Sequence, residues 1–193
     1  MTTANKITIF RILLIPVFIF LTLDYIRDCQ RGQQQEWQRF LACVVFALAT
    51  VSDAVDGYIA RRYHQKTTLG TYLDPLADKA LLISALVLLS HDSHGVFAKL
   101  PLWFPVLVIS RDIILLVGTI VIHMIVGHVK TQPRLVGKFA TVFQMITLGW
   151  VLLGIDRPPF QWPMIAAGLF TFASGIWYIL DGVNQLNAHE QKK

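Results

Sequence analysis

Six apolar runs occupy most of this 193-residue chain. A helix that crosses the hydrocarbon core of a bilayer needs about 20 predominantly apolar residues, and most of these runs approach or exceed that length. Lipid offers the backbone no hydrogen-bonding partner, so such segments are expected to be α-helical. Only 15% of the residues are charged, against about 25% in an ordinary soluble domain. The sequence therefore predicts an all-α, polytopic integral membrane protein with six transmembrane helices in a single domain, residues 1–193.

The six helices are expected at residues 7–23, 39–63, 72–90, 102–126, 137–153 and 163–180. The first run contains Arg11 and is interrupted by Pro16, and no small-residue cleavage site follows it, so we interpret it as a retained helix and not as a signal peptide. Residues 24–38 are expected to form a solvated polar linker. Pro75 is expected in the first turn of the third helix, where its missing N–H costs little.

The basic residues predict the orientation and the surroundings of the chain. The formal net charge is +5, but the basic residues are dispersed between apolar segments, which favours anionic lipid headgroups over nucleic acid as a partner. The most basic short loop is formed by Arg61, Arg62, His64 and Lys66. By the positive-inside rule this loop is cytoplasmic. With six spans, both termini and this end of the second and third helices then lie on the cytoplasmic side of the cell (inner) membrane.

Four carboxylates lie at the ends of two neighbouring apolar runs, where an ionisable group is costly and is usually functional. Asp53 and Asp56 are three residues apart, and Asp74 and Asp78 are four apart. In a helix, each pair therefore lies on one face. Because the link between the two helices is short, we expect them to be antiparallel neighbours, with the two pairs facing each other at one depth in the membrane.

Four carboxylates so close together would repel one another strongly unless cations lay between them. Oxygen ligands select hard cations, and magnesium in particular binds through a few carboxylates, waters and substrate phosphates. Two such ions can stabilise the attacking and leaving oxygens of a phosphoryl transfer together. The residues therefore predict a site for two Mg²⁺ ions, with Mn²⁺ as an alternative, and a phosphate ester or anhydride as the substrate.

The carboxylates belong to a longer pattern of eight fixed residues, Asp53-x2-Asp56-Gly57-x2-Ala60-Arg61-x8-Gly70-x3-Asp74-x3-Asp78. At every fixed position this pattern resembles the signature of the CDP-alcohol phosphatidyltransferase family. The resemblance covers most of the chain. It implies a membrane enzyme that transfers a phosphatidyl group from CDP-diacylglycerol to an alcohol and releases CMP.

The resemblance also implies roles for individual residues. Asp53, Asp56 and Asp74 would hold two divalent cations against the diphosphate of the donor. Asp78 would be a further metal ligand and the base that takes the proton from the attacking hydroxyl. The residues expected to contact CDP-diacylglycerol are Asn5, Thr8, Gly57, Arg61, Thr67 and Gly70. Because family members are commonly dimers, a homodimer is expected.

The acceptor is expected to bind at cations further along the chain. Arg111 and Asp112 lie inside the fourth apolar run, and a buried charge pair of this kind can also serve structure alone. The run Gly137-Lys138-x2-Thr141-x2-Gln144 resembles the corresponding run in family members that use glycerol 3-phosphate or phosphatidylglycerol. A polar stripe of this kind can also serve only to join helices through hydrogen bonds. We therefore expect Arg111 and Lys138, with Arg134 as a third cation, to bind the acceptor's phosphate.

Glycerol 3-phosphate is the favoured acceptor and phosphatidylglycerol the alternative. Family members that use glycerol 3-phosphate often carry a second Arg followed by Glu after the position of Arg111, whereas residues 116–119 of this chain are uncharged. Two functions of other classes are also open. A small cation transporter could place acids in a membrane, although such sites are expected near the midplane between repeated halves. A structural membrane protein could pair its acids with Arg61, Arg62 and Lys79.

Overall fold

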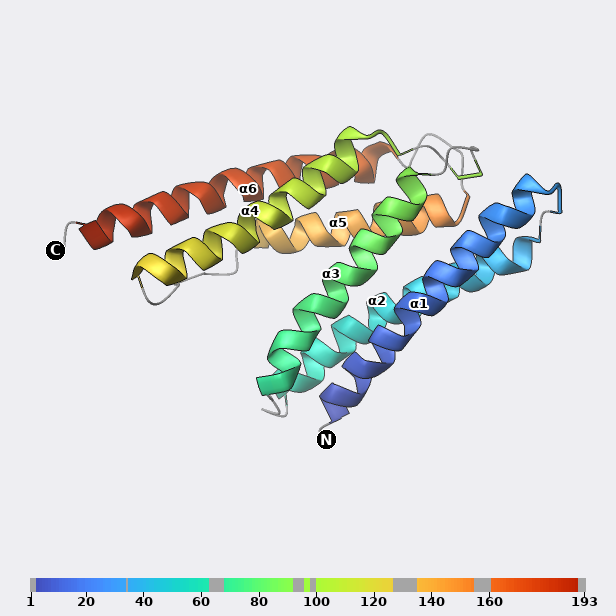
Figure 1. Ribbon diagram of the computed structural model, residues 1–193, viewed down its shortest axis with the longest axis horizontal. Coiled ribbons are helices and arrows are strands. Elements are labelled where there is room, and N and C mark those ends of the chain that lie inside the picture. Colours follow the sequence, from blue (N-terminus) through green and yellow to red (C-terminus); the bar gives the residue numbers. More distant parts are fainter. Residues whose placement is uncertain are drawn as a thin grey trace. The chain divides into compact units, whose positions relative to one another are not determined.

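The computed structural model describes residues 3–33, 35–62, 68–91, 96–97, 100–126, 135–154 and 161–190. Side chains are described in these ranges except at residues 3–6, 53–62, 68–76, 78, 123, 186 and 188–190. The described residues form six helices and no strand (Figure 1). The helices are α1 Thr3–Gln30, α2 Glu36–Arg62, α3 Thr68–Ser90, α4 Trp103–Val126, α5 Leu135–Leu152 and α6 Gln161–Glu190.

The predicted fold class, an all-helical membrane protein, is confirmed. Four of the described helices contain a stretch that is long and apolar enough to cross a membrane, namely Ile7–Gln30, Trp103–Ile122, Leu135–Leu152 and Gln161–Gln185. In α3, Lys79–Ser90 is a shorter apolar segment. Among the described residues, α2 and α3 contain no stretch that meets this criterion in full, so a full set of six spans stays a prediction.

The chain divides into two compact units. Met1–Leu100 and Leu148–Asp156 form the first unit, and Pro101–Thr147 and Arg157–Lys193 form the second. In the first unit, α1 packs against α2 and α3, which also contact each other. Phe18 of α1 and Phe46 of α2 lie in this core with their ring centroids 5.5 Å apart. Consecutive helices of this unit run in opposite directions (Figure 1), as expected for α2 and α3.

The polar linker predicted at residues 24–38 is wrong for most of its length. Residues 24–30 continue α1, and α2 already begins at Glu36. The reason is a contact between the two helices, because Gln38 Nε2 donates hydrogen bonds to Asp24 Oδ2 (2.9 Å) and Asp28 Oδ2 (3.0 Å). Arg27 in the last turn of α1 also complements the negative end of the helix dipole. Polar side chains that form hydrogen bonds to a neighbouring helix can therefore remain in helical segments, where a solvated loop was predicted.

Further helix boundaries differ from the prediction. The helix predicted at residues 7–23 contains Pro16 as expected, but α1 begins earlier, at Thr3, and ends later, at Gln30. α3 begins at Thr68, so Pro75 lies inside the helix and not in its first turn. α6 continues beyond residue 180 to Glu190.

In the second unit, α4 and α6 pack along a row of glycines. Gly168, Gly175 and Gly182 are spaced by seven residues and so lie on one face of α6. A Cβ added at Gly168 would lie 2.9 Å from the Trp103 ring, and one added at Gly182 would lie 3.3 Å from Ile122 Cδ1. The contacts follow the same order along both helices, so α4 and α6 run in the same direction. Small residues of this kind allow membrane helices to approach closely.

Hydroxyl and amide groups join the helices of the second unit. Thr119 of α4 and Tyr178 of α6 share a hydrogen bond between their hydroxyls. Gln144 of α5 donates from Nε2 to Thr171 Oγ1 of α6 at 2.8 Å, and both side chains are buried. Of the polar stripe on α5, Gln144 therefore joins helices, which is the structural alternative that the sequence left open.

Candidate functional site

The carboxylate pairs lie on two helices that contact each other. Asp53 and Asp56 are in the C-terminal part of α2, and Asp74 and Asp78 are in the N-terminal part of α3. Because α2 and α3 are antiparallel (Figure 1), these segments lie at the same end of the first unit. The side chains of all four residues lie outside the part of the chain that is described, so their arrangement around a metal stays a prediction. Within the described part, no group of three or more metal-ligating side chains occurs.

The predicted contacts of CDP-diacylglycerol are described unevenly. Asn5, Gly57, Arg61 and Gly70 belong to helices α1, α2 and α3, but their side chains lie outside the described residues, as does the whole of Thr67.

Thr8 is the one predicted donor contact whose side chain is described, and it is 1% exposed. Arg11 follows three residues later on the same face and is 0% exposed. The N-terminal part of α1 lies at the end of the first unit that carries the carboxylate pairs (Figure 1). A buried hydroxyl and a buried cation therefore lie at this end of the first unit.

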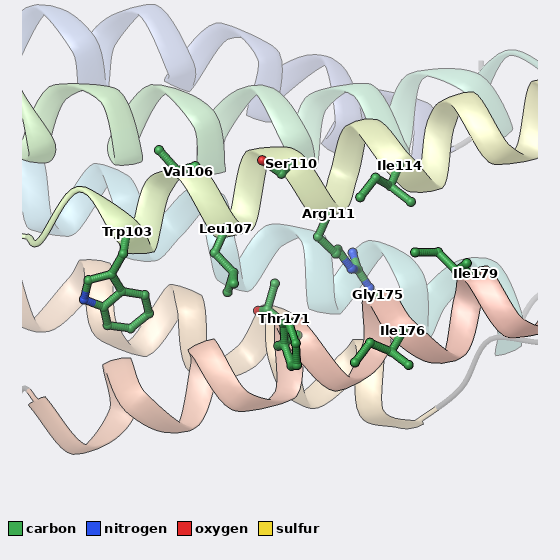
Figure 2. Close-up of a pocket in the computed structure, with 11 residues that line it drawn as sticks. Trp103, Val106, Leu107, Ser110, Arg111, Ile114, Thr171, Gly175, Ile176 and Ile179 are labelled. Carbon is green, nitrogen blue, oxygen red and sulfur yellow. The ribbon is translucent and has the colours of Figure 1, made fainter.

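Arg111 connects all three helices of the second unit. Its side chain extends from α4 toward α6 (Figure 2). Nη1 donates a hydrogen bond to Asp112 Oδ1 at 2.9 Å, and Nη2 donates one to Ser174 Oγ at 2.8 Å. The side chains of Arg111 and Asp112 are each 13% exposed. Arg111 Nε is buried without a hydrogen-bond partner among the described residues, which leaves a donor that a ligand could satisfy.

The first turn of α5 lies against the guanidinium of Arg111. A Cβ added at Gly137 would lie 3.0 Å from Arg111 Nη2 and 3.4 Å from Ser174 Oγ. The N–H groups in this turn have no acceptor within the helix and form the positive end of its dipole. Lys138 follows directly and is exposed. The guanidinium of Arg111 therefore lies beside a helix N-terminus and next to one carboxylate, and a helix N-terminus favours a bound anion.

Of the three residues predicted to bind the acceptor's phosphate, the structure thus places Arg111 beside the turn of α5 that carries Lys138. Arg134 lies outside the described residues. The sequence interpretation missed Ser174, the hydroxyl partner of Arg111. The seven-residue spacing of the glycines could have indicated this partner, because Ser174 directly precedes Gly175 and so lies close to the helix face that packs against α4.

A groove of about 390 Å³ lies between α4 and α6 beside Arg111. Its lining is mostly apolar, and Ser110, Arg111 and Thr171 are its polar residues. Figure 2 shows Arg111 crossing from α4 to α6 next to Gly175. The groove suits an apolar group better than a phosphate, so the anion-attracting surface is the side of Arg111 that faces the first turn of α5.

Comparison with known proteins adds an independent finding. The family model for CDP-alcohol phosphatidyltransferase matches residues 1–177. A protein of Shigella flexneri serotype 5b named CDP-diacylglycerol--glycerol-3-phosphate 3-phosphatidyltransferase is 30% identical over 184 residues, which cover 94% of this chain and 93% of the relative. A protein of the same name from Escherichia coli K12 is 32% identical over 146 residues, covering 76% of this chain and 74% of the relative.

Proposed function

The chain belongs to the CDP-alcohol phosphatidyltransferase family, and on this basis we propose that it transfers the phosphatidyl group of CDP-diacylglycerol to glycerol 3-phosphate, forming phosphatidylglycerophosphate and releasing CMP. That it is a phosphatidyltransferase of phospholipid biosynthesis follows from the family and from the names of its relatives. The choice of acceptor is the proposal. The structural observation that carries it is the guanidinium of Arg111 held against the first turn of α5.

The transfer makes one bond to phosphorus and breaks another. A hydroxyl oxygen of the acceptor bonds to the phosphorus of the phosphatidyl group, and the bond from that phosphorus to the bridging oxygen of CMP breaks. We assign to Asp78 the proton that the hydroxyl loses. Proximity and orientation of the two substrates supply much of the acceleration in such a reaction.

The four carboxylates of the first unit are suitable ligands for divalent cations. Asp53, Asp56, Asp74 and Asp78 offer oxygen ligands from two contacting helices, and hard cations such as Mg²⁺ or Mn²⁺ prefer oxygen ligands. When bound, two such ions would neutralise the charge of the donor's diphosphate. Asn5, Thr8, Gly57, Arg61, Thr67 and Gly70 stay proposed contacts of the donor.

The acceptor's phosphate is assigned to Arg111 and Lys138, with Arg134 as a third cation. A guanidinium has five N–H donors, and the hydrogen bonds to Asp112 and Ser174 occupy one each. We assign the remaining N–H groups of Nη1 and Nη2 to phosphate oxygens. Arg recognises phosphate through several parallel hydrogen bonds, which distinguishes a phosphorylated glycerol from glycerol itself.

The long apolar helices fit a membrane protein. We further propose that it resides in the cell (inner) membrane with its active site and both termini in the cytoplasm, because the most basic short loop joins the two carboxylate helices. The bilayer as a partner and a homodimer are also proposals.

Phosphatidylglycerol is the second candidate acceptor and would make the protein a cardiolipin synthase of the same family. Two observations favour it. Residues 116–119 are uncharged, and the groove beside Arg111 has the apolar lining that an acyl chain of a lipid acceptor would contact. The transporter and the purely structural alternatives are set aside, because the family consists of enzymes.

One assay tests the proposal. The purified full-length chain in detergent is incubated with CDP-diacylglycerol and Mg²⁺, and labelled glycerol 3-phosphate or phosphatidylglycerol is offered in separate reactions. CMP release and the lipid product are followed in both. A phosphorylated lipid product from glycerol 3-phosphate is expected. Product from phosphatidylglycerol alone would overturn the choice of acceptor, and no product from either would overturn the proposed reaction.

A further inference from the structure

The guanidinium of Arg111 occupies a space that exists because three neighbouring residues are small. Gly137 of α5 leaves room for Nη2, since an added Cβ would lie 3.0 Å from that atom. Ser174 of α6 has a small side chain, and its Oγ accepts a hydrogen bond from the same nitrogen at 2.8 Å. At Gly175 an added Cβ would lie 3.7 Å from Arg111 Cγ, which is ordinary van der Waals contact. The arginine is thus supported along its stem and at its tip.

We propose that Ser174 and Gly137 are positioning residues that set the affinity for the acceptor's phosphate by fixing the guanidinium of Arg111. This inference rests on the proposed function, in which Arg111 binds that phosphate. A long, flexible side chain that is already held in its binding geometry loses less conformational entropy when the ligand arrives. Ser174 and Asp112 take one N–H each from Nη2 and Nη1, and this arrangement fixes the rotation of the guanidinium plane.

Ser174→Ala removes the hydroxyl that holds Nη2. We expect the KM for glycerol 3-phosphate to rise about tenfold, because a hydrogen bond to a charged group is lost, while the KM for CDP-diacylglycerol stays the same. The matched control is Tyr178→Phe, which removes another hydroxyl from the same interface between α4 and α6, one that bonds to Thr119 and to the carbonyl oxygen of Leu115. That variant is expected to keep both KM values.

Gly137→Ala provides a second, independent variant. Its methyl group would displace Nη2, which is the far end of a flexible side chain, so the protein is expected to fold and to bind glycerol 3-phosphate more weakly. Gly118→Ala is the matched control, because a Cβ there would also lie 3.0 Å from its nearest neighbour, Tyr178 Cε1. Only the change beside the guanidinium should raise the KM for glycerol 3-phosphate.

Double variants that also carry Arg111→Ala distinguish a positioning role from a general structural role. In an Arg111→Ala background, Ser174→Ala and Gly137→Ala should add no further rise in the KM for glycerol 3-phosphate, since the group that they position is absent. The inference is wrong if the single variants leave this KM unchanged, or if they raise it by the same factor with and without Arg111. The unaltered protein in the same assay reports on the proposed function separately, because it must use glycerol 3-phosphate whatever the variants do.

Discussion

Gly154→Ala is expected to destabilise the first unit by about 2 kcal/mol, roughly twice the cost of Gly32→Ala. Both glycines have a left-handed backbone, with φ of 64° at Gly154 and 74° at Gly32. Their surroundings differ. A Cβ added at Gly32 would have nothing within 4 Å, whereas one added at Gly154 would lie 2.3 Å from Arg39 Nη1 and 3.0 Å from Arg39 Cζ. The pair therefore separates backbone strain from a steric contact.

The two costs can be estimated from the contacts. An L-residue in the left-handed region destabilises the folded state by about 1–2 kcal/mol. Alanine also lowers the conformational entropy of the unfolded chain, which stabilises the protein by about 0.4–1 kcal/mol. Gly32→Ala should therefore destabilise the protein by about 1 kcal/mol. At Gly154 the guanidinium of Arg39 must also move. It then loses its 2.7 Å ion pair with Glu36, about 0.3–0.5 kcal/mol at a surface. It also loses its position 6.0 Å above the Tyr25 ring, about 0.5–1 kcal/mol.

The assay is equilibrium unfolding of the purified full-length protein in detergent, followed by circular dichroism. Arg39→Ala serves as the background that removes the contact, and in it Gly154→Ala should cost no more than Gly32→Ala. Equal costs of the two glycine changes in the unaltered background, or an undiminished cost without Arg39, would refute the reasoning. Transfer activity at low temperature should be retained, because Arg39 and Asp53 are about 21 Å apart along α2 at the rise of an α-helix.

The remaining predictions concern the site and the second unit. Asp78→Asn should abolish CMP release while the far-UV circular dichroism is unchanged, and normal magnesium-dependent transfer by this variant would refute its role as the base. Asp53→Asn should raise the Mg²⁺ concentration needed for half-maximal transfer, and removal of divalent cations by EDTA should stop transfer until Mg²⁺ is restored. Arg111→Lys should raise the KM for glycerol 3-phosphate about tenfold, because an ammonium group replaces a planar set of donors; an unchanged KM would separate Arg111 from the acceptor. Gly168→Ala should destabilise the protein by about 1–3 kcal/mol, measured by unfolding in detergent, because its Cβ would lie 2.9 Å from the Trp103 ring; an unchanged midpoint would contradict close packing there.

The sequence by itself determined the helical membrane class and the location of the carboxylate pairs. The class follows from the long apolar runs, because a backbone in lipid must satisfy its own hydrogen bonds. The pairing of Asp53 with Asp56 and of Asp74 with Asp78 follows from helix periodicity, which is a local property. The contact between α2 and α3 follows from the short link that joins them.

The tertiary structure alone decided where helices end and what holds Arg111. The turn between α1 and α2 is short because Gln38 reaches Asp24 and Asp28 on the other helix, and local polarity gives no sign of such a partner. Ser174 lies 63 positions from Arg111 in the sequence yet bonds to it, because the glycines of α6 let α4 approach. Helix formation depends on neighbours along the chain, whereas these contacts depend on which helix faces pack together, and only the folded chain brings those faces into contact.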